Sequence, residues 1–371
     1  MQVCGLNAGQ RATFGAGHAF KVGLFGANLA GIGMSVIPER WAASWDDNVA
    51  VAKMAENAGI DFLLPVARWK GYGGATDPQG SSLETITWAT GLLAVTRRIT
   101  VFATVHVPLI HPLFAAKQFV TADQIGAGRF GLNIVCGWND AEFEMFGVAR
   151  KQDNRYDYAR EWIEIVKQAW SRDDTFDVDS EFFHLRNVRA LPKPWGATRP
   201  VLVSAAQSAE GVNFATRQCD VLFSNCPEDR NLPAWGASID ASRQAAGRLD
   251  MPVFTSCTVI CRSTQKEAED FENYLFDNGD HEAIDALIAI RDRSKRATFS
   301  GDIAAVRKRI AKGGGLYIVG DADQVAEQFA ALHRIGINGV AAMFTNQLDE
   351  LPFFVSEVLP RLERMGLRHT V

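Results

Sequence analysis

The chain has 371 residues, a formal net charge of −5 and a pI near 5.9. Hydrophobic residues make up 47% of it and charged residues 22%, a balance that is typical of a globular protein with a large core and that excludes a disordered chain. The sequence contains no run of Lys or Arg that could neutralise a row of phosphates, so we do not expect nucleic acid as a partner.

Two features of the sequence bear on the cellular compartment. The six cysteines lie in apolar segments, and the one close pair, Cys257 and Cys261, has no His or Cys partner at zinc spacing. We interpret all six as reduced thiols of a cytoplasmic protein. Residues 1–19 are rich in glycine and polar residues and show the pattern of neither a signal peptide nor a membrane span, so we expect a flexible N-terminal tail.

From residue 20 onward, short apolar runs alternate with longer segments of helical period, which is typical of parallel βα units. The apolar runs predict eight strands: 20–25, 61–66, 99–106, 129–136, 200–205, 220–224, 251–260 and 339–344. The amphipathic segments predict eight helices: 47–58, 83–95, 113–124, 156–170, 209–217, 238–247, 264–278 and 323–335. This alternation favours an α/β fold, a closed (β/α)8 TIM barrel in a single domain over residues 20–371, rather than an open doubly wound sheet.

Two segments depart from the simple alternation. Residues 175–185 alternate apolar and polar side chains around an acidic turn, which predicts a small hairpin before the fifth strand. The segment 280–320 is charged and carries a glycine run at 313–315, so we interpret it as an insertion after the seventh strand and its helix. Two alternatives stay open for this insertion, a lid over the site or a solvated excursion with no catalytic part.

In a barrel of this kind, functional residues gather where the strands end at their carboxyl side. Thr104 and His106 end the third predicted strand, Asn133 lies near the end of the fourth, and Trp138 follows where a planar ligand could stack. Ser208 stands just before a helix, whose unpaired N–H groups could bind a phosphate. The alternative is that Ser208 only caps that helix.

Several common site motifs are missing. His106 and His111 flank Pro108, but no third ligand follows at a sensible spacing, so we predict no metal site. Neither a G-x-S-x-G elbow nor a GxxxxGK[ST] phosphate loop occurs. The one GxGxxG string, at residues 126–131, runs from a predicted helix into a strand, so no such motif follows a strand and opens a helix. This argues against a bound nicotinamide cofactor, so any electrons must come from another source.

A resemblance to a known family is carried by two adjacent segments. Residues 128–147 (GRFGLNIVCGWNDAEFEMFG) and 154–162 (NRYDYAREW) resemble the bacterial luciferase-like flavin-dependent monooxygenases, and within them the pyrimidine (uracil) and dimethyl sulfone monooxygenase branches. Shorter matches occur before and after these segments, in the order that the family shows, at 68–74, 102–104, 111–118, 206–208 and 320–326. The resemblance implies a barrel that uses reduced FMN and O2.

The same resemblance implies how the site is built. FMN would lie across the barrel mouth, bound by seven residues: Ala67, Arg68, Asn133, Glu142, Arg155, Tyr156 and Ser208. Three of these, Arg155, Tyr156 and Ser208, would hold the phosphate. The implied catalytic residues are Thr104 and Asn133, which match the residues that hold O2 against the flavin in the pyrimidine branch, and Trp138, which would wall the substrate pocket.

The predicted function is therefore a two-component monooxygenase, in which a separate NAD(P)H-dependent flavin reductase supplies reduced FMN and a flavin peroxide oxygenates or cleaves a small organic substrate. A cyclic amide of the pyrimidine kind is the leading substrate, although Arg68, Trp69 and Lys70 stand where the pyrimidine branch carries Lys, Leu and Arg. Sulfones, alkanesulfonates and haloaromatics are alternatives. A deazaflavin-dependent dehydrogenase and a non-catalytic flavin-binding protein are less favoured, and the resemblance implies a homodimer or homotetramer.

Overall fold

The computed structural model describes residues 11, 17–31, 33–137, 139–148, 154–206, 208–227, 231–293, 302–313 and 315–369. At its centre, eight parallel strands close into a barrel in the order β9-β11-β1-β2-β3-β4-β7-β8, and β8 pairs again with β9. This confirms the predicted (β/α)8 TIM barrel. The barrel strands are β1 (Lys21–Phe25), β2 (Phe62–Leu64), β3 (Thr100–His106), β4 (Phe130–Val135), β7 (Val201–Ala205), β8 (Val221–Phe223), β9 (Val253–Cys261) and β11 (Gly339–Met343).

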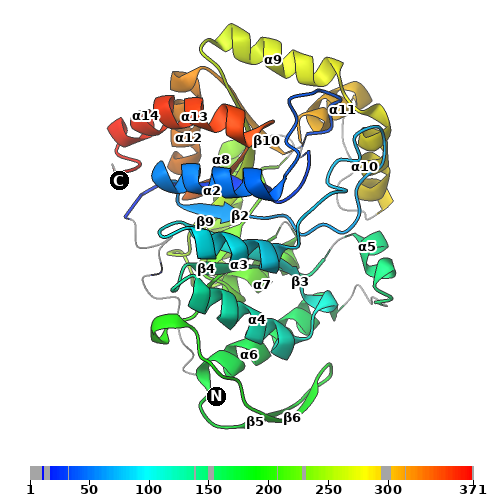
Figure 1. Ribbon diagram of the computed structural model, residues 1–371, viewed down its shortest axis with the longest axis vertical. Coiled ribbons are helices and arrows are strands. Elements are labelled where there is room, and N and C mark those ends of the chain that lie inside the picture. Colours follow the sequence, from blue (N-terminus) through cyan, green and yellow to red (C-terminus); the bar gives the residue numbers. More distant parts are fainter. Residues whose placement is uncertain are drawn as a thin grey trace.

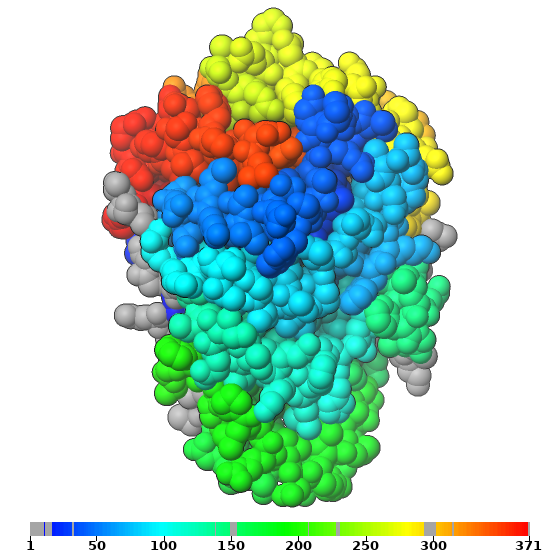
Figure 2. Space-filling model, viewed as in Figure 1, coloured from blue at the N-terminus to red at the C-terminus, as the bar shows by residue number. Residues whose placement is uncertain are grey.

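Helices surround the barrel, and each of the eight predicted helices has a counterpart (Figure 1). These are α2 (Trp45–Asn57), α3 (Thr85–Val95), α4 (Pro112–Ile125), α6 (Arg155–Ser171), α7 (Ala209–Gln218), α8 (Leu232–Ala245), α9 (Gln265–Asp277) and α12 (Ala322–Arg334). In the space-filling view, the side chains of α2, α3 and α4 cover the strands on one face (Figure 2). Within the described ranges, no helix is long and apolar enough to cross a membrane.

Additional elements decorate this frame. The predicted hairpin is confirmed as the antiparallel pair β5 (Phe176–Asp179) and β6 (His184–Val188), which projects beyond α6 at one end of the molecule (Figure 1). Three further helices were not predicted from the sequence: the short helix α5 (Asp140–Met145) and the C-terminal helices α13 (Gln347–Glu357) and α14 (Leu359–Arg364).

The predicted insertion contains regular structure that was not predicted from the sequence. Its described parts form α10 (His281–Arg293), α11 (Ile303–Ala311) and a further strand, β10 (Leu316–Gly320). β8 pairs with the start of β9 and β10 with its end, both on the edge opposite β11, so β10 extends the sheet without opening the barrel.

The two helices of this segment pack against the rest of the protein rather than standing in solvent. Whether they act as a lid or have no catalytic part stays a prediction. They share a buried apolar cluster with Met34 and Tyr72. Asp280, at the start of α10, accepts hydrogen bonds from the backbone nitrogen and the hydroxyl of Thr76 at 2.8 and 2.7 Å. The segment is thereby tied to the loop that follows β2.

The prediction of a flexible tail is wrong for Arg11 and His18, because both side chains are buried. Arg11 pairs with Asp123 at 2.5 Å, and His18 pairs with Asp61 at 2.8 Å. Asp61 also binds Arg368 at 2.5 Å. Burial raises the pKa of Asp61, but its hydrogen bonds and charge interactions with His18 and Arg368 outweigh burial and hold that pKa below its usual value. These partners lie far apart in the sequence, so the local pattern carries no sign of the contact.

The cysteines of the described residues form no disulfides, in line with the prediction of reduced thiols. They are buried, and burial raises the pKa of Cys219, of Cys257 and, to about 12, of Cys261. These groups therefore stay protonated at neutral pH. Cys4 lies outside the described residues.

The floor of the barrel is packed with aromatic rings. The Phe62 ring lies 5.3 Å from the stacked Phe254 ring and 5.8 Å from the edge-on Phe102 ring. Glycines on neighbouring strands make this possible: a Cβ atom added at Gly23 would lie 2.3 Å from the Phe62 ring, and one at Gly131 would lie 2.3 Å from the Phe102 ring. The side of the barrel that carries the strand amino ends is therefore solid, and a ligand can enter only from the other end.

We predict that Gly23→Ala lowers the free energy of unfolding by roughly 1–3 kcal/mol, because the new methyl group overpacks the floor against Phe62. Urea denaturation of Gly23→Ala, Phe62→Leu and the double variant measures the coupling. The smaller leucine side chain of Phe62→Leu should restore part of the loss, and simple additivity of the two changes would contradict this account of the packing.

Candidate functional site

The first group of site residues lies on the neighbouring strands β3 and β4. Thr104 and Asn133 are direct partners in the strand register, and their side chains are 6% and 5% exposed. Both lie two residues beyond the floor pair Phe102 and Gly131, so the two-residue period of a strand points them into the barrel on the same side.

The hydrogen bonds of this pair fix the direction of its protons. The Thr104 hydroxyl donates to the carbonyl oxygen of Pro65 at 2.6 Å, and Asn133 Nδ2 donates to Thr104 Oγ1 at 3.1 Å. Asn133 Oδ1 is buried and accepts no hydrogen bond from the described residues. A buried amide oxygen without a donor is costly, and a bound group that donates a hydrogen bond would satisfy it.

The second group fixes the loop after β2. Glu142 of α5 is 1% exposed, and its Oε1 accepts hydrogen bonds from Arg68 Nη1 at 3.2 Å and from the backbone nitrogens of Trp69 at 3.0 Å and Lys70 at 3.4 Å. Glu142 Oε2 has no partner among the described residues. The half-buried Ala67 precedes Arg68 in the chain. The structure thus brings Ala67, Arg68 and Glu142 together.

Asn28 belongs to the same group, and it was not selected from the sequence. It is fully buried, donates to the carbonyl of Val66 at 2.9 Å and accepts from the nitrogen of Val66 at 2.9 Å. This bracket holds the chain as it leaves β2. The Gly-Ala-Asn sequence of the first loop signals only a turn, because the partner lies 38 residues away.

The third group lies where α6 and α7 begin. Ser208 is the N-cap of α7 and accepts a hydrogen bond from the nitrogen of Gly211 at 3.2 Å. The hydroxyls of Tyr156 and Ser208 lie 3.2 Å apart, and the Arg155 guanidinium lies 4.8 Å from the centre of the Tyr156 ring. Two hydroxyls, a cation and a helix N-terminus converge here, which is the donor set that a phosphate requires.

Gly211 is what lets Tyr156 approach α7. A Cβ atom at this position would lie 2.6 Å from the Tyr156 hydroxyl oxygen and 3.3 Å from Ser208 Oγ. Gly211 was not selected from the sequence, because a glycine in the first turn of a helix has no distinctive pattern. Its role depends on a residue 55 positions earlier, which only the folded chain brings near.

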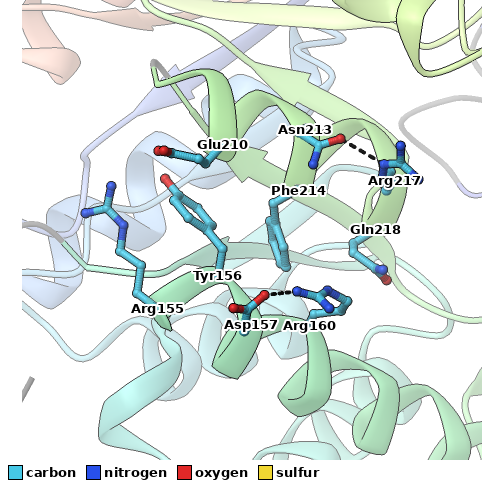
Figure 3. Close-up of a pocket in the computed structure, with 9 residues that line it drawn as sticks. All are labelled: Arg155, Tyr156, Asp157, Arg160, Glu210, Asn213, Phe214, Arg217 and Gln218. Atoms are coloured by element: carbon cyan, nitrogen blue, oxygen red, sulfur yellow. Dashed lines mark hydrogen bonds and ion pairs between the residues drawn. The ribbon is translucent and has the colours of Figure 1, made fainter. Parts of the chain in front are cut away.

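An open groove of about 460 Å³ starts at this third group and runs between α6 and α7 (Figure 3). Arg155 and Tyr156 line it, whereas Thr104, Asn133 and Glu142 do not. The groove is therefore distinct from the polar pair inside the barrel, and only the phosphate-type donor set joins it to the candidate site.

The remaining sequence candidates are placed as follows. Trp138 lies outside the described residues, so its predicted role stays a prediction. The ring of buried His106 lies 5.8 Å from the Phe143 ring. His111 instead caps α4, where Nδ1 accepts from the nitrogen of Leu113 at 3.3 Å. The part of the chain that the structure describes contains no cluster of His, Cys, Asp and Glu that could hold a metal ion.

The barrel, with its polar pair at the strand ends and its phosphate-type donor set, is that of an enzyme whose ligands enter at the carboxyl ends of the strands. Residues 22–339 match the family of luciferase-like monooxygenases, and the chain belongs to this family. The predicted family and the predicted enzyme class, a flavin-dependent monooxygenase, are thereby confirmed.

Two relatives are similar to this chain in sequence, and one solved structure is similar in fold. It is 29% identical over 357 residues to an FMNH(2)-dependent dimethylsulfone monooxygenase of Pseudomonas fluorescens, covering 94% of this chain and 96% of the relative. It is 30% identical over 331 residues to the pyrimidine monooxygenase RutA of Allorhizobium ampelinum, covering 85% of this chain and 89% of the relative. The crystal structure of riboflavin lyase (RcaE) with modified FMN and riboflavin matches with a TM-score of 0.83 at 20% identity, covering 94% of this chain and 92% of that one, which shows a shared fold.

We predict that Gly211→Ala weakens the binding of FMN and leaves the binding of riboflavin, which has no phosphate, unchanged. The added methyl group pushes the Tyr156 hydroxyl away from Ser208 and removes one hydrogen bond, worth about 1 kcal/mol. Fluorescence titration measures both affinities.

Stability provides the internal control for this variant, because Ala is the better helix former and a loss of fold is not expected. Tyr156→Phe should weaken FMN to a similar degree, and the double variant should be no weaker than either single change. An equal loss of riboflavin affinity would show that Gly211 acts on the whole site rather than on the phosphate end.

Proposed function

We propose that the protein is the oxygenase component of a two-component system, which takes reduced FMN from a separate flavin reductase and uses O2 to oxygenate or cleave a small organic substrate. The observation that carries this proposal is the Thr104–Asn133 pair, a hydroxyl and an amide buried inside the barrel and joined by a hydrogen bond of 3.1 Å. When bound, reduced FMN supplies the electrons and the reaction with O2.

The protein's own contribution at this pair is orientation in a dry cavity. Thr104 directs its proton to Pro65, so its oxygen offers a lone pair, and the Asn133 amide offers a dipole rather than a strong acid. The second N–H of Asn133 Nδ2 can donate a hydrogen bond to a negative oxygen species, and an amide is too weak an acid to protonate that oxygen. The buried Asn133 Oδ1, which accepts nothing from the described residues, fits a ring N–H donor of the cofactor.

Arg155, Tyr156 and Ser208 are proposed to hold the phosphate of FMN. The two hydroxyls and the N-terminus of α7 supply hydrogen bonds, and Arg155 supplies charge. Glu142 and Arg68 are proposed to hold the β2 loop, including Ala67, against the flavin ring. Trp138 is proposed to wall the substrate pocket.

A cyclic amide of the pyrimidine kind is the proposed substrate, supported by the 30% identity to a pyrimidine monooxygenase. A sulfone is the second candidate, favoured by the dimethylsulfone monooxygenase that matches over 94% of this chain. We propose a cytoplasmic homodimer or homotetramer, on the basis of the family resemblance.

The deciding experiment is O2 consumption by the purified protein with reduced FMN, in the presence of cyclic amides, sulfones, sulfonates and haloaromatics. Product formed in proportion to O2 from one class would support the proposal and identify the substrate type. Reduction of a deazaflavin by a substrate without O2 uptake would favour a dehydrogenase, and tight FMN binding with no turnover would favour a flavin-binding protein.

We predict that Asn133→Ala lowers product formation on the order of 100-fold, because one preorganised dipole at the reacting oxygen is lost. FMN affinity should change much less, since the phosphate end is intact. Ser204→Ala is the matched control: Ser204 is also buried on a neighbouring strand, but its hydroxyl donates to the carbonyl of Ile134 at 2.9 Å. Equal loss of FMN affinity and product would show that Asn133 is structural.

We predict that Arg155→Ala makes the free energy of FMN binding less favourable by roughly 1.5–3 kcal/mol, the range for a hydrogen bond to a charged group. Added salt should weaken FMN binding more in the wild-type protein than in the variant, because salt screens the attraction between the Arg155 charge and the phosphate. Arg334→Ala, which removes an exposed arginine paired with Glu327 on α12, is the control and should leave FMN affinity unchanged. Unchanged affinity in Arg155→Ala would remove this residue from the site.

A further inference from the structure

The groove between α6 and α7 extends well past the residues that the proposed function uses. Its volume of about 460 Å³ lies in the range of about 300–1,000 Å³ that is typical of small-molecule sites. A single phosphate bound by the hydroxyls of Tyr156 and Ser208 would fill only the end of the groove at Tyr156. The close-up shows the side chains of α6 and α7 facing one another across this space (Figure 3).

The direction of the groove follows from the helix that lines it. Ser208 caps α7 at the mouth of the barrel, and Arg217 lies nine residues further along the same helix. At about 1.5 Å per residue, this is a distance of roughly 13 Å. FMN ends at its phosphate, so the groove begins where FMN ends and continues for about the length of another nucleotide.

The lining has the chemistry of a nucleotide site. It combines three arginines, two aromatic rings, two carboxylates and two carboxamides. Arginine binds phosphates. Both arginine and aromatic rings stack on bases. Carboxylates accept hydrogen bonds from ribose hydroxyls. The side chains that carry these groups beyond Arg155 and Tyr156 are Asp157, Arg160, Glu210, Asn213, Phe214, Arg217 and Gln218.

Two contacts hold the cations in place along the walls. Arg160 pairs with Asp157 one turn earlier on α6. Arg217 donates from Nε to Asn213 Oδ1 at 2.8 Å, a bond that does not use its terminal Nη groups. A second phosphate, next to the one at Ser208, would therefore meet guanidinium groups on both helices.

We propose that this groove binds the adenylate half of a flavin adenine dinucleotide, so that the protein accepts FAD as well as FMN. The proposal rests on the proposed function in one respect, because it takes the first phosphate of the flavin to lie at Tyr156 and Ser208. The second phosphate then lies toward Arg160 and Arg217, and the adenosine lies along the groove beside Phe214.

The test uses oxidised FMN and FAD, titrated by flavin fluorescence into the full-length protein at low salt. Wild-type protein should bind FAD at least as tightly as FMN. Arg217→Ala should lower the affinity for FAD by about threefold to tenfold, as expected for the loss of a largely exposed cation that contacts a phosphate. The affinity for FMN should change less, so the ratio of the two affinities should shift in favour of FMN. Arg217→Lys should lie between the wild type and Arg217→Ala, because it keeps the charge but not the guanidinium.

Arg334→Ala is again the matched control, since Arg334, like Arg217, is an exposed arginine in the last turn of a helix. FAD binding weaker than FMN binding, or an equal effect of Arg217→Ala on both flavins, would overturn the proposal. Binding of oxidised flavins is independent of turnover. Flavin binding without oxygenation would therefore overturn only the proposed function, and oxygenation with FMN but no FAD binding would overturn only the adenylate groove.

Discussion

The register between β3 and β4 is the constraint on which the candidate site depends. Phe102 pairs with Gly131 and, two residues on, Thr104 pairs with Asn133. Because the Phe102 ring fills the space that a side chain at position 131 would occupy, the aromatic floor locks the two strands in this register. A slip of one strand by one residue would turn its polar side chain outward, toward the helices, and separate the pair. The packing of the floor therefore determines the geometry of the pair above it, and the site needs no separate device to align its hydroxyl with its amide.

Buried polar groups fix the position of the segment that follows β2. Asn28 brackets Val66 with two hydrogen bonds, and the Glu142 carboxylate holds Arg68 together with the next two backbone nitrogens. Burial raises the pKa of nearby Tyr72, against the lowering effect of Arg68, so its phenol stays a neutral hydrogen-bonding group. A segment without regular structure is thus fixed by buried hydrogen bonds, which suits the contact with FMN that we propose for it.

Sequence patterns were sufficient wherever the signal was local. Alternating apolar runs located all eight barrel strands, and the polar residues at the strand ends located Thr104 and Asn133. The strand β10 was missed because its five residues follow a glycine run inside a charged segment, and its pairing with β9 is visible only in the fold. Arg11, Asn28 and Gly211 were missed for a related reason: each acts on a residue 38 or more positions away in the chain. Such contacts leave no periodic trace in the sequence.

The division of the site between strands and loops explains why the fold alone does not determine the substrate. The Thr104–Asn133 pair lies on two strands whose register is locked, and the phosphate-type donors lie at the starts of two helices. Arg68, Trp69 and Lys70, where we expect a departure from the pyrimidine branch, lie instead on the β2 loop. Trp69 is 42% exposed, and its ring centre lies 5.0 Å from that of Phe146, which follows α5. Relatives that act on a sulfone and on a pyrimidine match this chain almost equally well. We therefore expect substrate choice to depend on a few loop side chains and cofactor handling to depend on the barrel itself.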